Sequence, residues 1–324
     1  MTVERVALVL GATGGIGGEV ARHLLVRRWT VHALGRDPDK VSAANRDQGL
    51  IWHRGDAMAG ADVAAAAEGA SVIVHAVNPP GYRNWGKFVL PMLDNTIAAA
   101  RAHGARILLP GTVYNYGPDV FPNPREDSPQ NPRTFKGRIR AEMERRLRTV
   151  STAGARVLIV RAGDYFGPRA GNSWFAQGLV APGKPVRTIT NPGRPGVGHQ
   201  WAYLPDVAET MVQLLEKPEV LDDFAAFHME GYWDADGTGM IEAIRRAAGN
   251  PNIKVGRMPW TLLRLLSPFV PLFRELAELQ YLWNVPLRLS NDRLKSVLGA
   301  EPHSPLDAAV RETLIGLGCL PSKG

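Results

Sequence analysis

The fold can be inferred first from residues 6–17, which read Val6-Ala-Leu-Val-Leu-Gly-Ala-Thr-Gly-Gly-Ile-Gly17. A short apolar run typical of a buried strand leads into a glycine repeat, and apolar residues at helical spacing follow. Here Gly11 permits a tight turn, Gly14 lets the backbone approach a pyrophosphate, and Gly17 lets the helix pack closely on the strand. The alternative is a turn that serves packing alone. The flanking strand and helix favour a dinucleotide-binding turn made of Gly11, Thr13, Gly14, Gly15, Ile16 and Gly17.

Around this turn, short runs rich in valine, isoleucine and leucine alternate with longer helix-like stretches, which is typical of a parallel sheet covered by helices. We expect strands at Val6–Leu10, Thr30–Leu34, Leu50–His53, Ser71–His75, Arg106–Leu109 and Arg156–Val160. We expect helices near Ile16–Arg28, Ala61–Ala67, Gly86–His103 and Phe135–Thr149. Right-handed crossovers make this an α/β fold, a Rossmann doubly wound parallel sheet, whose ligands bind at the carboxyl ends of the strands.

The regular alternation ends near residue 165. Glycine and proline then become frequent, as in residues 182–198, PGKPVRTITNPGRPGVG. This change predicts excursions from the sheet that build a second lobe. We therefore expect residues 1–165 to form the cofactor-binding domain, and residues 166–324 to form mainly a smaller C-terminal substrate-binding lobe, interleaved with late sheet and helix elements.

Length and composition indicate a globular protein. The 324 residues (35.3 kDa) suffice for a full core, and a hydrophobic fraction of 45% with 21% charged residues excludes disordered and collagen-like chains. Lysine and arginine (38) exceed aspartate and glutamate (31), and the resulting net charge of +7 favours anionic ligands. Because the basic residues are spread along the chain without interleaved aromatics, we expect no nucleic-acid partner.

Nothing in the sequence indicates export or membrane insertion. The most apolar late stretch, Pro259–Phe273, contains an arginine and two internal prolines, so we expect a lid or packing helix and no membrane partner. The chain starts as a strand rather than a signal peptide, because an acidic residue interrupts its start. The single cysteine, Cys319, cannot form an intramolecular disulfide, which fits a cytoplasmic setting.

The end of the second predicted strand, Leu34-Gly-Arg36-Asp37, bears on the choice of dinucleotide. An NAD site usually places an acid here for the ribose 2′-hydroxyl. Arg36 instead offers a bidentate, charge-assisted partner to a 2′-phosphate, so NADP(H) is favoured. In the alternative, Arg36 is a solvated turn residue, Asp37 binds the ribose and the cofactor is NAD(H).

Further segments follow the glycine turn in order: Gly55-Asp-Ala57, Ala76-Val77, Arg161-Ala-Gly-Asp-Tyr-Phe-Gly-Pro168, Trp201-Ala-Tyr-Leu-Pro-Asp-Val-Ala208 and Asn291–Leu298. With this order, nearly the whole chain resembles the extended short-chain dehydrogenase/reductase family, the NAD-dependent epimerase/dehydratase group. The resemblance implies that Asp56 and Ala57 contact the adenine. It also implies that Ala76 and Val77 lie beside the cofactor.

The residues expected to be catalytic depart from the pattern of that family. Its Ser-x-x-x-x-Gly stretch, whose serine or threonine holds the substrate oxygen, resembles Thr112-Val-Tyr-Asn-Tyr-Gly117. Its Tyr-x-x-x-Lys pair corresponds here to Lys136 and Arg140. In the family chemistry the tyrosine passes a proton to a carbonyl oxygen as hydride arrives. Without that phenol, this chain cannot use the mechanism unchanged.

Lys136 and Arg36 locally resemble an atypical branch of the same fold, the isoflavone, pinoresinol and phenylcoumaran benzylic ether reductases. That branch carries a lysine in a Lys-x-x-x-Arg-like helix start and an NADPH-type arginine. Because Lys136 and Arg140 are four residues apart, they share one helix face, where the guanidinium would favour the neutral amine. Lys136 could then be a general acid or base. The alternative is a solvated basic helix face formed by Lys136, Arg138 and Arg140.

Candidates for substrate contact follow the fifth and sixth predicted strands, and they are Tyr114, Tyr116, Asp164 and Tyr165. Tyr114 and Tyr116 could substitute for the missing phenol, because they lie in the loop at the carboxyl edge of the sheet, or they could be core or pocket walls. Asp164 and Tyr165 could simply form the turn into the second lobe. No HxH, HExxH or CxxC spacing occurs, so we expect no metal site.

These patterns together predict an NADP(H)-dependent oxidoreductase of the atypical extended short-chain type. Its small-molecule substrate is an organic carbonyl or activated alkene. Thr112 orients the substrate oxygen, and Lys136, tuned by Arg140, transfers the proton. The alternatives are a nucleotide-sugar epimerase/dehydratase-like enzyme and a non-catalytic NADP(H)-binding redox sensor. The protein could also form a homodimer through the helices that flank the sheet, and the sequence does not decide this.

Overall fold

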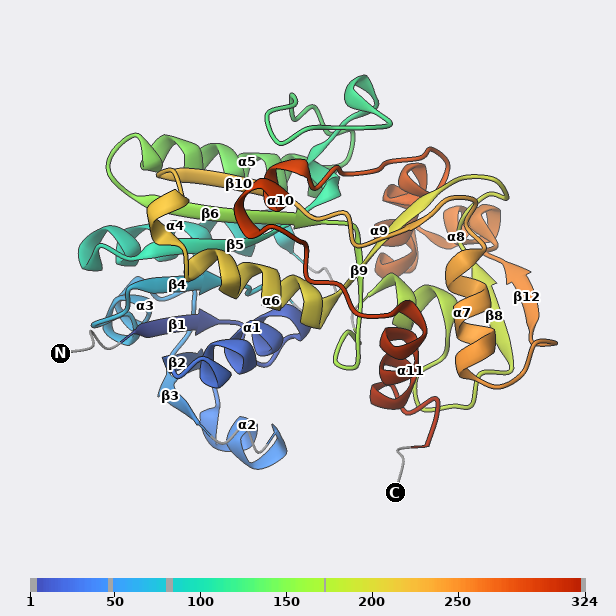
Figure 1. The fold of residues 1–324 in the computed structure, drawn as a ribbon, viewed down its shortest axis with the longest axis horizontal. Helices are drawn as coiled ribbons and strands as arrows, with labels where there is room; N and C mark the ends of the chain where they lie inside the picture. Colours follow the sequence, from blue (N-terminus) through green and yellow to red (C-terminus); the bar gives the residue numbers. More distant parts are fainter. Residues whose placement is uncertain (1–4, 46–48, 80–83, 172, 322–324) are drawn as a thin grey trace.

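The structure, a computed structural model, describes residues 5–45, 49–79, 84–171 and 173–321. Figure 1 shows two parts side by side: a layered part formed mostly by the first half of the chain, and a smaller lobe formed by the second half. The strands of the layered part point toward the lobe (Figure 1), so their carboxyl ends lie near the junction between the two parts.

The layered part is built on one parallel sheet. Its strands are β1 (Val6–Leu10), β2 (Thr30–Gly35), β3 (Leu50–Arg54), β4 (Val72–His75), β5 (Arg106–Thr112), β6 (Arg156–Ala162) and β10 (Phe224–His228). They form a seven-stranded sheet in the order β10-β6-β5-β4-β1-β2-β3, and every neighbouring pair is parallel. The six predicted strands and the doubly wound sheet are confirmed. β10 is absent from the prediction, because it carries two alanines where a strand usually has β-branched residues.

Helices cover both faces of this sheet. The layer contains α1 (Gly15–Val26), α2 (Pro38–Asn45), α3 (Gly60–Ala66), α4 (Trp85–His103), α5 (Phe135–Ser151), α6 (Leu204–Leu215) and α10 (Asp292–Leu298). α1 and α6 pack against each other on one face, and α3, α4 and α5 cover the other. Successive residues of β1 alternate between these faces, so Val9 packs in the core under α1 and α6, whereas Leu8 packs in the core under α3, α4 and α5. The four predicted helices are confirmed, whereas the polar α2 escaped prediction.

The smaller lobe has two short sheets. β7 (Asp164–Phe166), β9 (His199–Tyr203) and β11 (Tyr232–Asp234) form a three-stranded sheet, and β8 (Thr188–Asn191) pairs with β12 (Lys254–Arg257). The lobe also contains α7 (Gly239–Ala247), α8 (Trp260–Leu266), α9 (Pro271–Glu278) and α11 (Leu306–Gly316). Its core is rich in aromatic side chains, including Phe166, Trp174, Phe175, Trp201 and Trp283.

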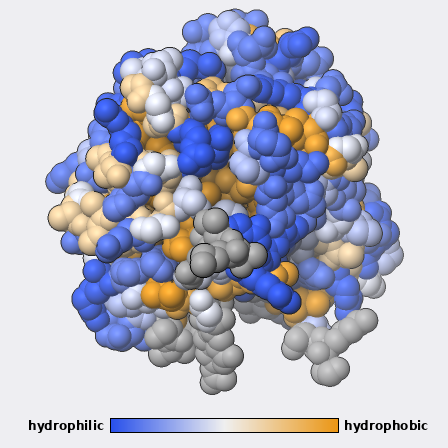
Figure 2. Space-filling model, turned by 60° about the vertical axis from the view of Figure 1, so that its left-hand side comes forward, coloured by the Kyte–Doolittle hydropathy of each residue, from blue (hydrophilic) through white to orange (hydrophobic). Residues whose placement is uncertain are grey.

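The outside of the molecule is mixed in character. Figure 2 shows one face, on which apolar areas lie between hydrophilic ones. Three large apolar side chains project from α8 and the turn after it, and Phe269 is the most exposed of them at 82%. Along the described part of the chain, every helix is either too short or too polar to cross a bilayer.

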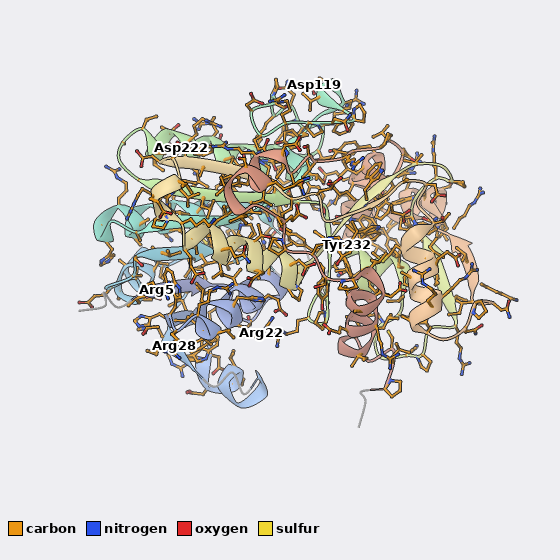
Figure 3. All side chains as sticks on the ribbon, viewed as in Figure 1. Arg5, Arg22, Arg28, Asp119, Asp222 and Tyr232 are labelled. Carbon is orange, nitrogen blue, oxygen red and sulfur yellow. The ribbon has the colours of Figure 1, made fainter. Side chains whose placement is uncertain are left out.

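Asp206, at the start of α6, joins the lobe to the sheet. Its buried carboxylate accepts hydrogen bonds from the Tyr232 hydroxyl (3.2 Å) and from the Ser304 amide (2.9 Å) and hydroxyl (2.7 Å). Tyr232 lies between the two parts (Figure 3). Because these donors compensate the loss of hydration, the carboxylate can be buried at the junction.

Candidate cofactor and active site

The glycine turn leads from β1 into α1, as the sequence predicts. Gly11 has a φ of +92°, in the left-handed region that favours glycine, and its carbonyl accepts the Gly14 N–H (2.9 Å). A Cβ on Gly11 would lie 2.6 Å from the Ala76 carbonyl oxygen, and a Cβ on Gly17 would lie 2.3 Å from the Gly11 oxygen. Gly11 therefore makes the tight turn, and Gly17 permits the close approach of helix and strand.

A cavity of about 900 Å³ opens beside this turn. Loops that follow β1 to β6 line it, and so do Arg169, Ala170 and, at the start of α6, Leu204. The predicted cofactor residues that line it are Gly11, Thr13, Gly14, Gly15, Ile16, Arg36, Asp56, Ala57, Ala76 and Val77. Gly17 lies behind the turn, packed on Gly11. The cavity has the size of an ordinary ligand site, and the backbone cradle fits a dinucleotide.

The cavity spans the place where the strand order reverses, between β1 and β4. In doubly wound sheets a dinucleotide lies across this crevice, with its pyrophosphate at the glycine turn. Residues 35–37 and 55–58, after β2 and β3, then form the adenosine half. Residues 112–114 and 162–165, at the ends of β5 and β6, form the nicotinamide half.

Arg36 and Asp37 both line the adenosine half but differ in their surroundings. The Asp37 carboxylate pairs with Lys40 Nζ at 2.9 Å and lies 4.0 Å from Arg54 Nη1. Arg36 is exposed, and its guanidinium makes no ion pair with any residue that the structure describes. The carboxylate of Asp37 thus has a charged partner within the protein, whereas Arg36, which lines the same part of the cavity, has none among the described residues.

The turn after β3 is held by its own hydrogen bonds. The Asp56 amide donates to Asp62 Oδ2 (2.8 Å), and Asp56 Oδ1 accepts the Met58 amide (2.9 Å). The Asn95 side chain donates to the Ala57 carbonyl (2.9 Å). These bonds tie the turn to α3 and α4 and fix the wall of the adenosine half.

A chain of hydrogen bonds crosses the nicotinamide half. The Tyr114 hydroxyl donates to Asp164 Oδ1 (3.1 Å), and His199 Nε2 lies 2.9 Å from Asp164 Oδ2. Tyr114 and Asp164 line the cavity, and His199 stands behind Asp164. The sequence predicts Tyr114 and Asp164 separately as substrate contacts and offers His199 only as a possible pocket residue, because no motif links the three. Their link comes from the parallel register of β7 and β9, in which Asp164 lies opposite Trp201.

Thr112 and Tyr165 complete the wall of the nicotinamide half. Thr112 Oγ1 accepts the Tyr114 amide (3.2 Å) and donates to Asn115 Oδ1 (3.3 Å). The Tyr165 hydroxyl donates to the Gly111 carbonyl (3.0 Å), and burial raises the pKa of this phenol. Tyr165 therefore holds the end of β5 in place, while the Thr112 hydroxyl borders the cavity.

Of the predicted pair on α5, only Arg140 is among the residues that line the cavity. Arg140 lines the cavity, where its Nη2 donates to Asn78 Oδ1 (3.3 Å) and its guanidinium lies 5.2 Å from the Trp85 ring centroid. Lys136 is 1% exposed and does not line the cavity. Because Lys136 and Arg140 are both buried, the alternative of a solvated basic face is wrong for them, and it holds only for Arg138.

Tyr116 is not brought to the cavity. It is fully buried, and its hydroxyl lies 2.7 Å from His228 Nε2 and accepts a hydrogen bond from Arg161 Nη1 (2.9 Å). Arg161 in turn makes a bidentate ion pair with Glu144 of α5, at 2.9 and 2.6 Å. This buried network joins the loop after β5 to α5, β6 and β10, and the Tyr116 hydroxyl is engaged in its hydrogen bonds.

We searched residues 5–45, 49–79, 84–171 and 173–321 for clusters of side chains that could bind a metal ion. No group of three or more histidine, cysteine, aspartate or glutamate side chains in these ranges could hold one.

Comparisons with known proteins place the chain in a family. Residues 7–228 match the NAD dependent epimerase/dehydratase family. No curated protein matches the chain. Nothing in the comparisons bears on the local resemblance to the isoflavone and pinoresinol reductases, which stays a prediction.

Several solved structures share the fold over almost the whole chain. A UDP-glucose 4-epimerase from Thermus thermophilus, in complex with NAD, is 19% identical, with a TM-score of 0.70 over 96% of this chain and 98% of that one. A UDP-glucuronic acid 4-epimerase from Bacillus cereus, in complex with NAD, is 15% identical, with a TM-score of 0.72 over 96% of each chain. MoeE5, in complex with UDP-glucose and NAD, is 17% identical, with a TM-score of 0.71 over 96% of this chain and 98% of that one. At such identities the likeness is one of fold, and with the family match over residues 7–228 it shows that this chain belongs to the NAD-dependent epimerase/dehydratase family.

Proposed function

We propose that this protein is an NADP(H)-dependent oxidoreductase that reduces a small organic carbonyl or activated alkene. The observation that carries the proposal is the contrast between Arg36 and Asp37 in the adenosine half of the cavity. Asp37 is paired with Lys40 (2.9 Å), whereas Arg36 lines the cavity without an ion pair to any residue that the structure describes. A guanidinium binds a 2′-phosphate through paired charge-assisted hydrogen bonds, and a carboxylate already paired is a poorer acceptor for a ribose hydroxyl.

The residues of the chain divide the work of binding. The backbone of the glycine turn and the start of α1 hold the pyrophosphate, and Arg36 holds the 2′-phosphate. When bound, the cofactor supplies or accepts a hydride. Thr112 orients the substrate oxygen through its hydroxyl, and Arg140 brings a positive charge to the same half of the cavity.

A second candidate is a nucleotide-sugar epimerase/dehydratase-like enzyme that uses NAD(H). The family itself favours it, and so do the epimerase structures in complex with NAD that this chain resembles. In that case Asp37 would leave Lys40 and bind the ribose. The departure at Lys136, where the family carries tyrosine, weighs against this candidate.

Cofactor titration tests the proposal. Binding of NADPH and NADH is followed through the fluorescence of the eight tryptophans. We expect tighter binding of NADPH, and we expect Arg36→Ala to weaken NADPH binding about tenfold to a hundredfold while leaving NADH binding unchanged. Arg101→Ala removes an exposed arginine from the far end of α4 and is the matched control.

The outcomes separate the candidates. Preference for NADPH that Arg36→Ala abolishes, together with NADPH consumption on a panel of carbonyls and activated alkenes, supports the proposed oxidoreductase. Tighter binding of NADH, lost in Asp37→Ala, favours the second candidate. NADPH binding without turnover on any substrate indicates a redox sensor, and failure to bind either cofactor contradicts all three functions.

A further inference from the structure

A buried carboxylate joins a phenol to an imidazole in the nicotinamide half of the cavity. Asp164 is 7% exposed and Tyr114 is 9% exposed, yet both line the cavity. Burial of a carboxylate is costly unless donors surround it, and here the Tyr114 hydroxyl (3.1 Å) and His199 Nε2 (2.9 Å) occupy its two oxygens. The three side chains therefore form one continuous path for a proton.

Tyr114 and Thr112 line the same half of the cavity. Thr112 and Ala162 are paired at the ends of β5 and β6, and Tyr114 and Asp164 each follow two residues later. The Thr112 hydroxyl also accepts the Tyr114 amide (3.2 Å). A substrate oxygen oriented by Thr112 would thus lie in the half of the cavity that Tyr114 and Asp164 also line.

The other proton donors that the sequence suggests are placed less well. Lys136 is 1% exposed and does not line the cavity. The Tyr165 hydroxyl donates to the Gly111 carbonyl, and Tyr116 belongs to the buried network with Arg161. Of the phenols, only Tyr114 both lines the cavity and contacts an acid–base pair among the residues that the structure describes.

We propose that Tyr114 gives the proton in carbonyl reduction and that Asp164 and His199 restore it. This inference rests on the proposed function. The carbonyl carbon accepts the hydride of the cofactor, the electron pair of the C=O bond moves to the oxygen, and that oxygen takes the proton of Tyr114. The phenolate regains a proton from His199 through Asp164, and His199 is reprotonated by a proton (H⁺) from the bulk solvent. Each turnover converts one carbonyl, one NADPH and one proton into one alcohol and one NADP⁺.

Two tryptophans fix the far end of this path. The His199 ring stacks on Trp283, with centroids 3.7 Å apart and planes 6° apart, and it meets Trp201 edge-on at 4.9 Å. The imidazole therefore has little freedom to turn away from Asp164. Asp164 and His199 are positioning residues in this scheme, and Tyr114 is the catalytic residue.

Fluorine NMR of protein labelled with 3-fluorotyrosine tests the path without any substrate. The seven tyrosines give few signals, and Tyr114→Phe and Tyr116→Phe assign two of them. We expect Asp164→Asn and His199→Gln to move the Tyr114 signal but not the Tyr116 signal. We also expect NADP⁺ to move the Tyr114 signal. A Tyr114 signal that ignores both variants and the cofactor overturns the proposal.

Kinetics with a substrate from the carbonyl panel give a second test. Tyr114→Phe should lower kcat about a hundredfold to ten-thousandfold with KM nearly unchanged, as expected for loss of a general acid. Asp164→Asn and His199→Gln should lower kcat less, also at constant KM. Tyr116→Phe removes a phenol from the same loop outside the cavity and is the matched control, with kcat unchanged. A loss of kcat in Lys136→Met that Tyr114→Phe does not share overturns the proposal.

The two proposals fail in different ways. If tryptophan fluorescence shows no NADPH binding, the proposed function and the proton path fall together. If NADPH binds but the Tyr114 signal and kcat are indifferent to Asp164→Asn, the path alone is wrong. If no substrate is found, the fluorine spectra still decide whether the three residues are coupled at the bound cofactor.

Discussion

The close approach of α1 to the turn after β1 depends on Gly17, because glycine has no Cβ. A Cβ there would lie 2.3 Å from the Gly11 oxygen and 3.1 Å from Ala76 Cβ, and the first of these is backbone that cannot turn aside. We expect Gly17→Ala to lower the free energy of unfolding by about 1–3 kcal/mol and to weaken NADPH binding. Urea denaturation measures the first effect. Gly256→Ala in β12, where nothing lies within 4 Å, should change neither, and equal effects of the two variants would contradict this account.

Glu144 and Arg161 form an ion pair with almost no access to water, since their side chains are 4% and 0% exposed. Glu144→Gln leaves the guanidinium buried without its counter-charge. We expect the variant to lose about 3–5 kcal/mol of unfolding free energy in chemical denaturation. Glu142→Gln, on the same helix α5, breaks more exposed pairs with Arg145 and Arg146 and should cost about 0–1 kcal/mol. Similar losses in both variants would show that burial does not matter here.

Two buried histidines make stability depend on pH. Burial, reinforced by the charge of Arg140, lowers the pKa of His75 to about 3, and burial beside Arg161 lowers that of His228 to about 2. Both histidines stay neutral in the folded protein, but in the unfolded chain they bind protons below about pH 6.5. Proton binding therefore stabilises the unfolded state relative to the folded state as the pH falls. Below pH 6.5 we expect each to remove up to about 1.4 kcal/mol of stability per pH unit. Denaturation curves at pH 7, 6 and 5 give the free energy of unfolding at each pH. We expect this free energy to fall less steeply with decreasing pH in His75→Asn than in the parent protein. An equal dependence on pH would exclude His75 as a cause of the pH dependence.

At the scale of elements, the start of α5 is held by both parts of the molecule. The Thr134 hydroxyl accepts the Gly137 amide (2.9 Å), and the Glu278 carboxylate at the end of α9 accepts the amides of Phe135 and Lys136. We expect Glu278→Ala to speed hydrogen exchange at those two amides, because they would lose the carboxylate that accepts them. Thr134→Ala should instead affect Gly137 and cost about 1 kcal/mol.

Hydrogen exchange followed by NMR resolves these amides one by one. Glu219→Ala, at an exposed site between α6 and β10, is the control and should leave α5 unchanged. Faster exchange along the whole of α5 in Glu278→Ala would mean that the lobe holds the entire helix rather than its first turn.

The elements also show why some of the fold could be predicted and some could not. β5 runs on to Thr112, three residues beyond the predicted end, because Pro110 and Gly111 are paired with β6 although their types indicate a turn. The glycine turn is local, since its strand, glycines and helix are adjacent in sequence, and the structure has this order of strand, turn and helix. The contact of Asp164 with His199 depends on the register between β7 and β9, which no local pattern contains.

At the scale of the whole molecule, the layered part needs residues from the second half of the chain. α6 packs on α1, and Met211 and Val212 of α6 share a core with Val9 and Leu24. We expect a fragment of residues 1–165 to aggregate, because one face of its sheet is left uncovered. Co-expression with residues 166–324 should restore a soluble complex, which size-exclusion chromatography detects. A monomeric fragment 1–165 that unfolds cooperatively would contradict this expectation.

The place of β10 in the sheet also matters while the protein is being made. β10 pairs with β6, yet it follows β6 only after the first strands of the lobe. At a translation rate of about 5–20 residues per second, the roughly 60 residues between them take about 3–12 s to synthesise. Until then the nascent chain carries an open β6 edge whose unpaired backbone groups can recruit a neighbouring polypeptide on the same polysome. A chaperone that shields this edge would therefore raise the yield of folded protein most during those seconds.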